Sequence, residues 1–217
     1  MNPDLQRELM AALERPHRLG TIGGDLEEQL AHCASFSSVL ADVGVDPAGR
    51  GIDLGTGGGL PGLALAMLWP NMAWTLVDMR VARATEVERS ALRLGLGDRT
   101  VVNAVEAQQL GHDENHRELY DVAVARAFGP ASITAECAAG LVRPGGVLVV
   151  SEPPTDAEST EDRWDGASLP HLGFSGPTWS TPDRGGRFAV FRKERGAPAV
   201  IPRMPARANR GWYRPSS

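Results

Sequence analysis

Lysine and cysteine are nearly absent from this sequence of 217 residues, in which Lys193 is the only lysine and Cys33 and Cys137 are the only cysteines. Two cysteines support neither a disulfide framework nor a metal-site spacing, so we expect two small buried side chains and no metal centre. Arginine therefore carries nearly all of the positive charge. Its planar guanidinium group suits bidentate contacts with phosphate better than a lysine ammonium does.

Long apolar runs are also missing. No stretch approaches the roughly 18 to 20 apolar residues that a membrane span needs. Asp4 and Glu8 lie where a signal peptide would have basic residues followed by an apolar run. We therefore expect a cytoplasmic protein without a membrane partner. Apolar residues make up 42% of the chain, which at this length suits one globular domain with a substantial core.

The net charge of −5 is unevenly distributed. Residues 184 to 217 contain nine basic residues and one acidic residue, a balance of +8, which leaves −13 for residues 1 to 183. A basic end on an acidic body can be the electrostatic footprint of a polyanion such as RNA, and it can also be a solvated tail. Composition does not separate these two interpretations.

The chain is organised around residues 51 to 62, which read Gly-Ile-Asp-Leu-Gly-Thr-Gly-Gly-Gly-Leu-Pro-Gly. The pattern predicts a strand, a glycine loop (residues 55 to 59) and a helix that begins near Pro61, a residue favoured in a first helical turn. Glycine allows positive φ and a close approach of a ligand, and a helix N-terminus offers free N–H groups to an anion. We therefore predict a ligand site here.

The rest of the chain predicts an α/β fold. A helix through Leu5, Leu9 and Leu13 is expected to end at Pro16, and a second is expected to start at Asp25 and run to about Val43. We expect strands at 50–54, 74–78, 100–103, 121–126 and 146–151, helices near 60–69, 80–95, 105–110 and 130–142, a mobile loop at 152–171, and an antiparallel hairpin of 174–180 and 188–192. The expected parts are a helical cap (1–45), a ligand-binding domain (46–195) and a basic, proline-rich tail (196–217).

Two nucleotide-like ligands fit the glycine loop. Gly57, Gly59 and Gly62 match the dinucleotide fingerprint, with Asp78 at a suitable distance to bind a ribose. However, Asp53 gives the loop a D-x-G-x-G-x-G form that resembles motif I of the class I methyltransferases, and a terminal hairpin after five parallel strands closes that fold. We therefore favour S-adenosylmethionine, with Asp78 on its ribose hydroxyls, over Asp78 as a helix cap.

The sequence resembles the glucose-inhibited division protein B family, bacterial methyltransferases that form 7-methylguanosine in small-subunit ribosomal RNA. The resemblance rests on residues 53 to 62 with their Leu-Pro-Gly ending, on 76 to 78 (Leu-Val-Asp), on 105 and 106 (Val-Glu) and on 125 to 128 (Ala-Arg-Ala-Phe). It implies a class I, Rossmann-like fold: a mostly parallel seven-stranded sheet with an antiparallel C-terminal hairpin and an N-terminal helical cap. It also implies S-adenosylmethionine as cofactor and ribosomal RNA or the small ribosomal subunit as partner.

Motif and resemblance together define the predicted site. Arg126, at the end of the fourth strand, is the candidate catalytic residue, to orient either the acceptor or the carboxylate of the cofactor. His32 is expected to be a packed side chain and Glu152 a solvated acid, although either could contact the acceptor. The predicted cofactor-binding residues are Asp53, Gly55, Gly57, Gly59, Leu60, Asp78, Val105, Glu106 and Arg126.

The acceptor stays open at this point. N7 of guanine carries a free lone pair and needs no general base, which agrees with the lack of an Asn/Asp-Pro-Pro-aromatic element. Several positions that are basic in the family are not basic here: Ala104 stands in place of an arginine, and Glu152 follows the fifth strand in place of a Lys-Gly ending. A small-molecule methyltransferase, or a protein that binds the cofactor without turnover, therefore remains an alternative.

Overall fold

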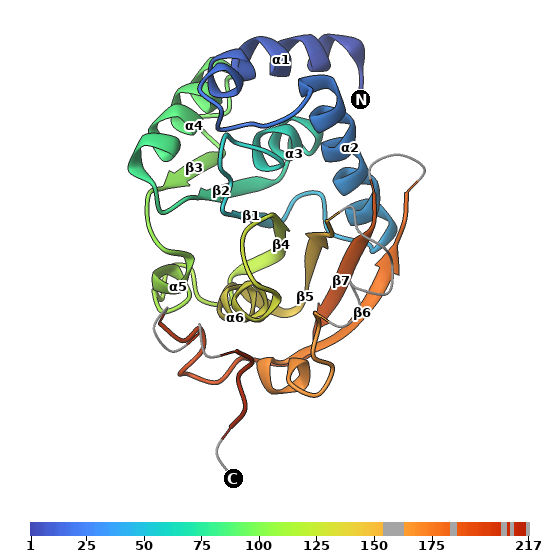
Figure 1. Cartoon of the computed structure of the whole chain (residues 1–217), viewed down its shortest axis with the longest axis vertical. Helices are drawn as coiled ribbons and strands as arrows, with labels where there is room; N and C mark the ends of the chain where they lie inside the picture. The colour runs from blue at the N-terminus through green and yellow to red at the C-terminus, as the bar shows by residue number, and fades with distance from the viewer. Residues whose placement is uncertain (154–162, 183–185, 205–207, 209–210, 216–217) are drawn as a thin grey trace.

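The fold is a seven-stranded sheet with helices on both faces (Figure 1). The computed structural model describes residues 1–153, 163–182, 186–204, 208 and 211–215. The strand order is β3-β2-β1-β4-β5-β7-β6, in which β1 to β5 are parallel and β7 is antiparallel to β5 and β6. The strands are β1 (Arg50–Leu54), β2 (Ala73–Val77), β3 (Thr100–Asn103), β4 (Tyr120–Arg126), β5 (Val142–Ser151), β6 (Phe174–Ser180) and β7 (Phe188–Lys193). The predicted five parallel strands and C-terminal hairpin are confirmed.

Two groups of helices cover the sheet. The helices are α1 (Pro3–Arg18), α2 (Leu26–Asp42), α3 (Gly62–Leu68), α4 (Val81–Arg93), α5 (Ala107–Leu110) and α6 (Ala131–Leu141), with a 3-10 helix η1 (Leu169–Leu172). Their ends differ by only a few residues from the prediction for α2 to α6. None of the helices in the described ranges is long and apolar enough to cross a membrane.

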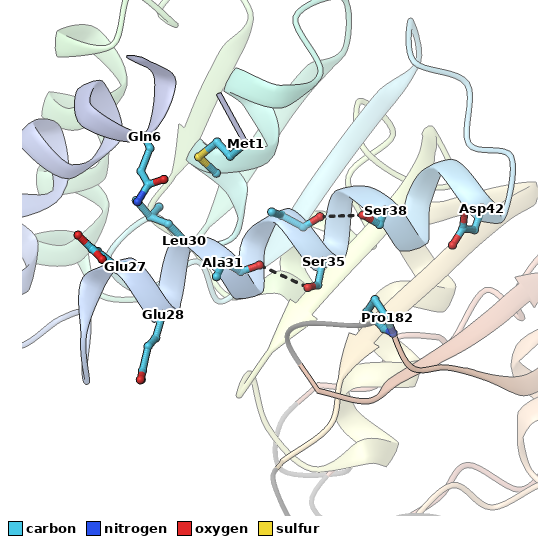
Figure 2. A pocket seen from close by; sticks show the side chains of 11 residues that line it. Met1, Gln6, Glu27, Glu28, Leu30, Ala31, Ser35, Ser38, Asp42 and Pro182 are labelled. Atoms are coloured by element: carbon cyan, nitrogen blue, oxygen red, sulfur yellow. Dashed lines mark hydrogen bonds between the residues drawn. The ribbon is translucent and has the colours of Figure 1, made fainter. Parts of the chain in front are cut away.

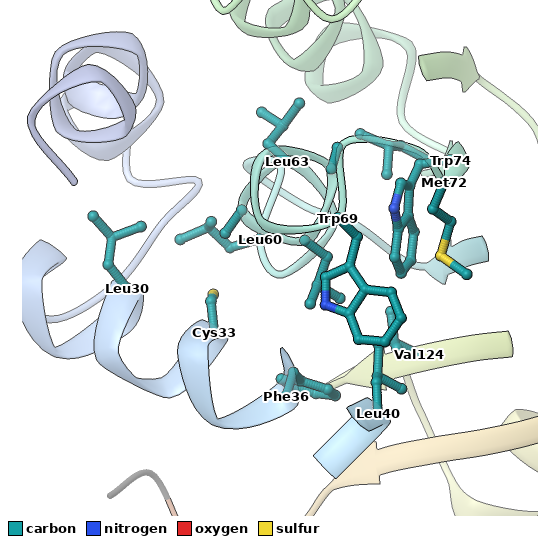
Figure 3. Close-up of a cluster of buried hydrophobic side chains, with 14 of the residues drawn as sticks. Leu30, Cys33, Phe36, Leu40, Leu60, Leu63, Trp69, Met72, Trp74 and Val124 are labelled. Atoms are coloured by element: carbon teal, nitrogen blue, oxygen red, sulfur yellow. The ribbon is translucent and has the colours of Figure 1, made fainter. Parts of the chain in front are cut away.

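Alternation along β4 divides the core into two clusters, because successive side chains of a strand point to opposite faces of the sheet. Val122 and Val124 belong to the cluster that α1 to α4 cover, where Figure 3 shows Val124 with side chains of α2 and α3. Ala123 and Ala125 belong to the cluster beneath α5, α6 and η1. Cys33 and Cys137 are free and buried, one in each cluster, as predicted.

Pro16 does not end α1, which continues to Arg18, so this predicted boundary is wrong. A proline inside a helix removes the N–H that would bind the carbonyl four residues earlier, here that of Ala12. The hydroxyl of Ser90, a buried residue of α4, donates to this carbonyl at 3.2 Å. A tertiary contact thus satisfies the group that the proline leaves free.

Residues 163 to 171 are not a loose loop, although residues 154–162 of the predicted mobile loop lie outside the described part. Trp164 and Leu169 are buried, and η1 packs beside α6. A run without helical or strand periodicity therefore still supplies core side chains, because each apolar residue packs singly against the sheet. Sequence periodicity does not detect such contacts.

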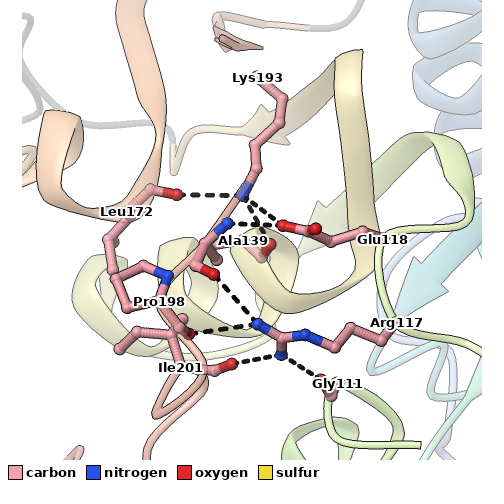
Figure 4. Close-up of polar contacts among 9 residues, drawn as sticks. Gly111, Arg117, Glu118, Ala139, Leu172, Lys193, Pro198 and Ile201 are labelled. Atoms are coloured by element: carbon pink, nitrogen blue, oxygen red, sulfur yellow. Dashed lines mark hydrogen bonds and ion pairs between the residues drawn. The ribbon is translucent and has the colours of Figure 1, made fainter. Parts of the chain in front are cut away.

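The basic C-terminal segment is partly built into the fold (Figure 4). Lys193 is buried and donates to the carbonyls of Ala139 and Leu172, and burial lowers its pKa to about 8 despite the nearby Glu118. The guanidinium group of Arg117 holds residues 197 to 201 in place by donating to the carbonyl oxygens of Ala197, Pro198 and Ile201. It also donates to the carbonyl oxygen of Gly111.

Arg203 forms an ion pair with the buried carboxylate of Glu136, and Arg192 donates to the carbonyl of Val43. Neither a solvated tail nor a polyanion footprint, the two interpretations of this basic segment, describes Lys193 and Arg203, which have partners within the fold. The charged groups of Lys193 and Arg203 bind carbonyl oxygens and a buried carboxylate inside the fold. Arg184, Arg207 and Arg210 lie outside the described residues.

Replacing Ser90 by alanine should lower the free energy of unfolding by about 1 kcal/mol, because the buried carbonyl of Ala12 would lose its partner. Urea denaturation of the two proteins measures this difference. Ser38→Ala is the matched control, since the Ser38 hydroxyl is exposed and bonds within its own helix. Equal destabilisation by both changes would contradict this account of Pro16.

Candidate functional site

The glycine loop connects the carboxyl end of β1 to α3, at the edge of the sheet where parallel strands place ligands. Gly55, Gly57 and Gly59 have φ values of 67°, 59° and 102°, which side chains other than glycine rarely adopt. A Cβ atom on Gly55 would lie 2.6 Å from the ring of Phe128. The three alternate glycines are therefore required by backbone conformation, and Gly55 also by the close approach of Phe128.

The linker between α1 and α2 lies against this loop. A Cβ atom on Gly58 would lie 2.3 Å from Cγ1 of Ile22 and 3.0 Å from the hydroxyl oxygen of Thr21. Ile22 and Leu60 are buried in the same cluster. The cap residues thus contribute directly to the surroundings of the loop, which no motif in the sequence indicated.

Asp53 lies buried at the end of β1, beneath the loop. Its Oδ2 accepts a hydrogen bond of 2.9 Å from the N–H of Gly62, at the start of α3. Its Oδ1 is buried without a hydrogen-bond partner among the described residues. Burial raises the pKa of Asp53 to about 6, partly offset by the hydroxyl of Thr56, the bond from Gly62 and the charge of Arg126. The hydroxyl of Thr56 is buried as well, so the protein encloses the carboxylate of Asp53 beneath the loop.

Asp78 follows β2 and holds the loop from the other side. Its Oδ2 accepts from the N–H of Gly57 at 3.1 Å and its Oδ1 from the N–H of Arg80 at 2.9 Å. Arg80 occupies the N-cap position of α4 without a side-chain capping bond, so Asp78 itself is not at the cap position. Each carboxylate oxygen of Asp78 can accept a second hydrogen bond. The two oxygens therefore still match the two hydroxyl groups of a vicinal diol.

Val105 and Glu106 lie at the start of α5, after β3, where both are half-buried. Glu106 occupies the cap position of α5 but its side chain makes no capping bond. Sequence reasoning missed Asn103, the last residue of β3, whose Nδ2 is buried and has no hydrogen-bond partner in the described structure. Its backbone carbonyl accepts from the N–H of Asp78 at 3.2 Å, so the ends of β2 and β3 are joined.

A cavity of about 1130 Å³ opens beside the loop, between α2, the carboxyl ends of β4 and β5, and the hairpin. It contains the predicted Arg126, with His32 and Glu152. Phe128 also lines it, so one ring touches both the glycine loop and the cavity. The side chains that sequence reasoning missed include Gln29, Thr134, Arg163 and Arg187, and Phe128 was recognised only as part of the motif at 125 to 128. Only the tertiary structure brings these distant segments together.

Arg126 is the last residue of β4 and is half-buried. Its NH1 donates to Oε1 of Gln29, on α2, at 2.6 Å. The next residue, Ala127, has a φ of 51°, which is uncommon for a residue with a side chain and turns the chain sharply after the strand. This turn places Arg126 and Phe128 on the wall of one cavity.

His32 was expected to be a packed side chain and Glu152 a solvated acid, and the structure differs from each expectation in part or in full. His32 packs on Phe188 as a core side chain would, but its Nε2 also lies 2.8 Å from the hydroxyl of Ser151 on the cavity wall. The expectation that Glu152 is solvated is wrong: it is buried and accepts from Arg163 at 3.0 Å and from Trp164 at 2.9 Å. Burial raises the pKa of Glu152, opposed by these two partners.

A second groove, of about 870 Å³, follows the other flank of α2 (Figure 2). Glu27, Glu28 and Asp42 are its charged lining residues, and it shares Glu28 and Ala31 with the cavity. An acidic surface repels a polyanion. The flank of α2 that faces this groove is therefore unfavourable for a polyanion.

Replacing Asp53 by asparagine should remove a pH dependence of stability. A carboxyl with a raised pKa in the folded state binds more protons than in the unfolded state, so the free energy of unfolding falls as pH rises from about 4 to about 6. The stability of Asp53→Asn relative to the unchanged protein should therefore rise by about 2 kcal/mol between pH 4.5 and 7. Urea denaturation at both pH values measures it; Asp98→Asn, an exposed change, is the control. An Asp53→Asn difference independent of pH would contradict the raised pKa.

Comparisons with known proteins agree on one family. The model of the family GidB, rRNA small subunit methyltransferase G, matches residues 24–165, or 142 of 217 residues. The ribosomal RNA small subunit methyltransferase G of Synechococcus sp. (strain CC9902) is 39% identical over 51% of this chain and 46% of its own length. The chain thus spans about half the length of this relative. The protein of the same name from Symbiobacterium thermophilum is 31% identical over 94% of this chain and 87% of its own length.

The solved structure of the S-adenosylmethionine-dependent methyltransferase SibL has a TM-score of 0.56 with 17% identity, over 75% of this chain and 56% of that one. At this identity the likeness concerns the fold alone. The predicted class I methyltransferase fold and the predicted family are both confirmed. With the glycine loop, Asp53, Asp78 and Arg126 in one edge of the sheet, the chain belongs to the rRNA small subunit methyltransferase G family.

Proposed function

We propose that the protein transfers a methyl group from S-adenosylmethionine to a guanine ring nitrogen, N7, in small-subunit ribosomal RNA. The observation that carries the proposal is the position of Phe128, whose ring contacts Gly55 of the glycine loop and lines the adjoining cavity. A donor on the loop and an acceptor in the cavity would therefore meet at one place. The relatives in this family are named as methyltransferases of ribosomal RNA.

The residues around the loop fit the proposed cofactor. Backbone N–H groups of a glycine loop suit its carboxylate, and Asp53 would support the loop from beneath through its bond from Gly62. Asp78 would hold the ribose hydroxyls with its remaining lone pairs. Val105 and Glu106, after β3, would border the adenine. Gly55, Gly57, Gly59 and Leu60 would shape the floor of this site.

Bound S-adenosylmethionine would supply a methyl group on a positively charged sulfur. Because N7 of guanine has a free lone pair, the protein has no proton to remove. Its task is to hold the acceptor in line with the methyl group and to exclude water. Phe128, which borders both the loop and the cavity, would orient the acceptor, and Arg126 would orient either the acceptor or the carboxylate of the cofactor. A substrate in ribosomal RNA also agrees with the expectation of a cytoplasmic protein.

A small-molecule acceptor is the second candidate. It is favoured by the use of Lys193 and Arg203 within the fold, which leaves the C-terminal segment with less charge for RNA than its sequence suggests. The cavity volume of about 1130 Å³ is within the scale of small-ligand sites and also admits a splayed-out nucleotide.

Asp78→Ala should weaken S-adenosylmethionine binding at least tenfold, because hydrogen bonds to a charged group contribute roughly 1.5–3 kcal/mol each. Isothermal titration calorimetry measures the dissociation constant. Asp98→Ala, which changes an exposed aspartate, is the control. No binding by the unchanged protein, or equal binding by Asp78→Ala, would refute the cofactor assignment.

A transfer assay separates the two acceptors. Labelled methyl groups should enter unmodified small ribosomal subunits, in RNA, and less so as salt is added, because phosphate contacts are salt-dependent. Total RNA and a small-molecule extract are tested in parallel. Transfer to the extract with none to RNA would establish the small-molecule candidate, and no transfer at all would point to a binding protein without turnover.

A further inference from the structure

Residues 19 to 25 join α1 to α2 and lie against the glycine loop; we call this segment the cap linker. Two residues fix it to the end of α1. The backbone N–H and the hydroxyl of Thr21 both donate to the carbonyl oxygen of Pro16, at 3.0 and 2.8 Å. Nε2 of His17 lies 2.8 Å from the carbonyl oxygen of Gly24. The cap linker therefore has a defined position over the loop.

Gly58 is the residue of the loop on which the cap linker packs most closely. A Cβ atom there would lie 2.3 Å from Cγ1 of Ile22 and 3.0 Å from the hydroxyl oxygen of Thr21. Ile22 is only 3% exposed, and Gly58 is buried as well. The loop is thus held at two consecutive residues, because Asp78 accepts a hydrogen bond from the N–H of Gly57.

At Gly57 the loop and the cap linker leave a space between two carbonyl oxygens. The oxygens of Thr21 and Gly55 lie 3.7 and 3.9 Å from the position of a Cβ atom on Gly57. Apart from Gly57 and its two chain neighbours, no other described atom lies within 4 Å of that position. All three residues are half-buried, so a ligand can reach this space.

The two carbonyl oxygens are available to a ligand. Among the described residues, no backbone N–H donates to either of them. A carbonyl oxygen is the negative end of the peptide dipole and accepts up to two hydrogen bonds. Two such oxygens on either side of one space attract a cation that can donate hydrogen bonds. An ammonium group, which has three N–H donors and no acceptor, meets this requirement.

Nearby carboxylates add to the preference for a cation. Asp53 lies beneath the loop with none of its surface exposed, and its pKa of about 6 leaves it mostly ionised at neutral pH, although the charge of Arg126 offsets part of its field. Asp78 is bound to Gly57 itself. The groups on either side of the open space are nevertheless the two carbonyl oxygens, one from the loop and one from the cap linker.

We propose that the carbonyl oxygen of Thr21 binds the α-ammonium group of the methyl donor, together with the carbonyl oxygen of Gly55, and that Ile22 is the positioning residue that keeps the cap linker on the loop. The inference rests on the proposed function in that the donor is S-adenosylmethionine. It makes the N-terminal cap a part of the donor site. The N–H groups of the loop stay available for the donor carboxylate.

The test compares S-adenosylhomocysteine with its deamino analogue, which lacks only the α-ammonium group. The unchanged protein should bind S-adenosylhomocysteine about tenfold more tightly, because hydrogen bonds to a charged group are among the stronger ones. Ile22→Ala, which opens a gap between the cap linker and the loop, should reduce this ratio by about threefold or more. Ile22→Val, which keeps a carbon at the contact with Gly58, should preserve it. Isothermal titration calorimetry gives the affinities.

Gly58→Ala disturbs the same contact from the side of the loop, because its Cβ atom would displace Ile22, and it should also reduce the ratio. The matched control is Leu40→Ala, which removes a fully buried side chain of the same core cluster near the other end of α2. It should destabilise the fold and leave the ratio unchanged, and urea denaturation shows that each variant is folded. An equal loss of the ratio in Leu40→Ala and Ile22→Ala would overturn the proposal, as would an unchanged ratio in both Ile22→Ala and Gly58→Ala.

Failure of this proposal and failure of the proposed function give different results. An unchanged protein that binds both ligands equally would contradict the role of Thr21 alone, whereas one that binds neither would overturn the cofactor assignment as well. In the transfer assay, Ile22→Ala should raise the KM for S-adenosylmethionine and leave the KM for small ribosomal subunits unchanged. A rise in the second KM alone would overturn the proposal. A protein that is inactive on RNA but prefers the ligand with the ammonium group would contradict the RNA acceptor and support the role of Thr21.

Discussion

The hydrogen bond between the N–H of Gly62 and Oδ2 of Asp53 is the contact on which the geometry of the site depends. It joins the end of β1 to the start of α3, so the loop between them is held at both ends. Gly62 must lack a side chain, because a Cβ atom there would lie 2.2 Å from Leu76 and 2.8 Å from the same carboxylate oxygen. The cost of burying Asp53 is expressed in its raised pKa. One buried carboxylate thus holds both ends of the glycine loop.

Asp78 extends this arrangement to the next strand. It binds the N–H of Gly57 with one oxygen and the N–H of Arg80 with the other, so the conformation of the loop depends on β2 as well as on β1. On the opposite side, the ring of Phe128 packs against Gly55, where it leaves no room for a side chain, and it also borders the cavity. The parallel order of β2, β1 and β4 brings these three strand ends together, which is why the glycine loop and the cavity adjoin.

Arginine has two different uses in this chain. Arg117 and Arg203 bind carbonyls or a buried carboxylate and fix the C-terminal segment, as does the single lysine, Lys193. Arg126 binds only the amide of Gln29 among the described residues and faces a cavity. Net charge along the sequence does not distinguish these cases, because a guanidinium group that packs within the fold and one that faces a cavity count equally. Their partners distinguish them.

The sequence by itself determined the glycine loop, the positions of the strands along the chain, the hairpin and the family, because glycine spacing and apolar periodicity are local properties of the chain. Its pattern also indicated Asp53, Asp78 and Arg126. Only the tertiary structure decided that α1 continues through Pro16, that Glu152 is buried, and that Gln29 meets Arg126, since each depends on a partner far away in the chain. The glycine loop could be recognised from its own residues, whereas the cavity is assembled from α2, two strand ends and the hairpin, and no short stretch of sequence contains it.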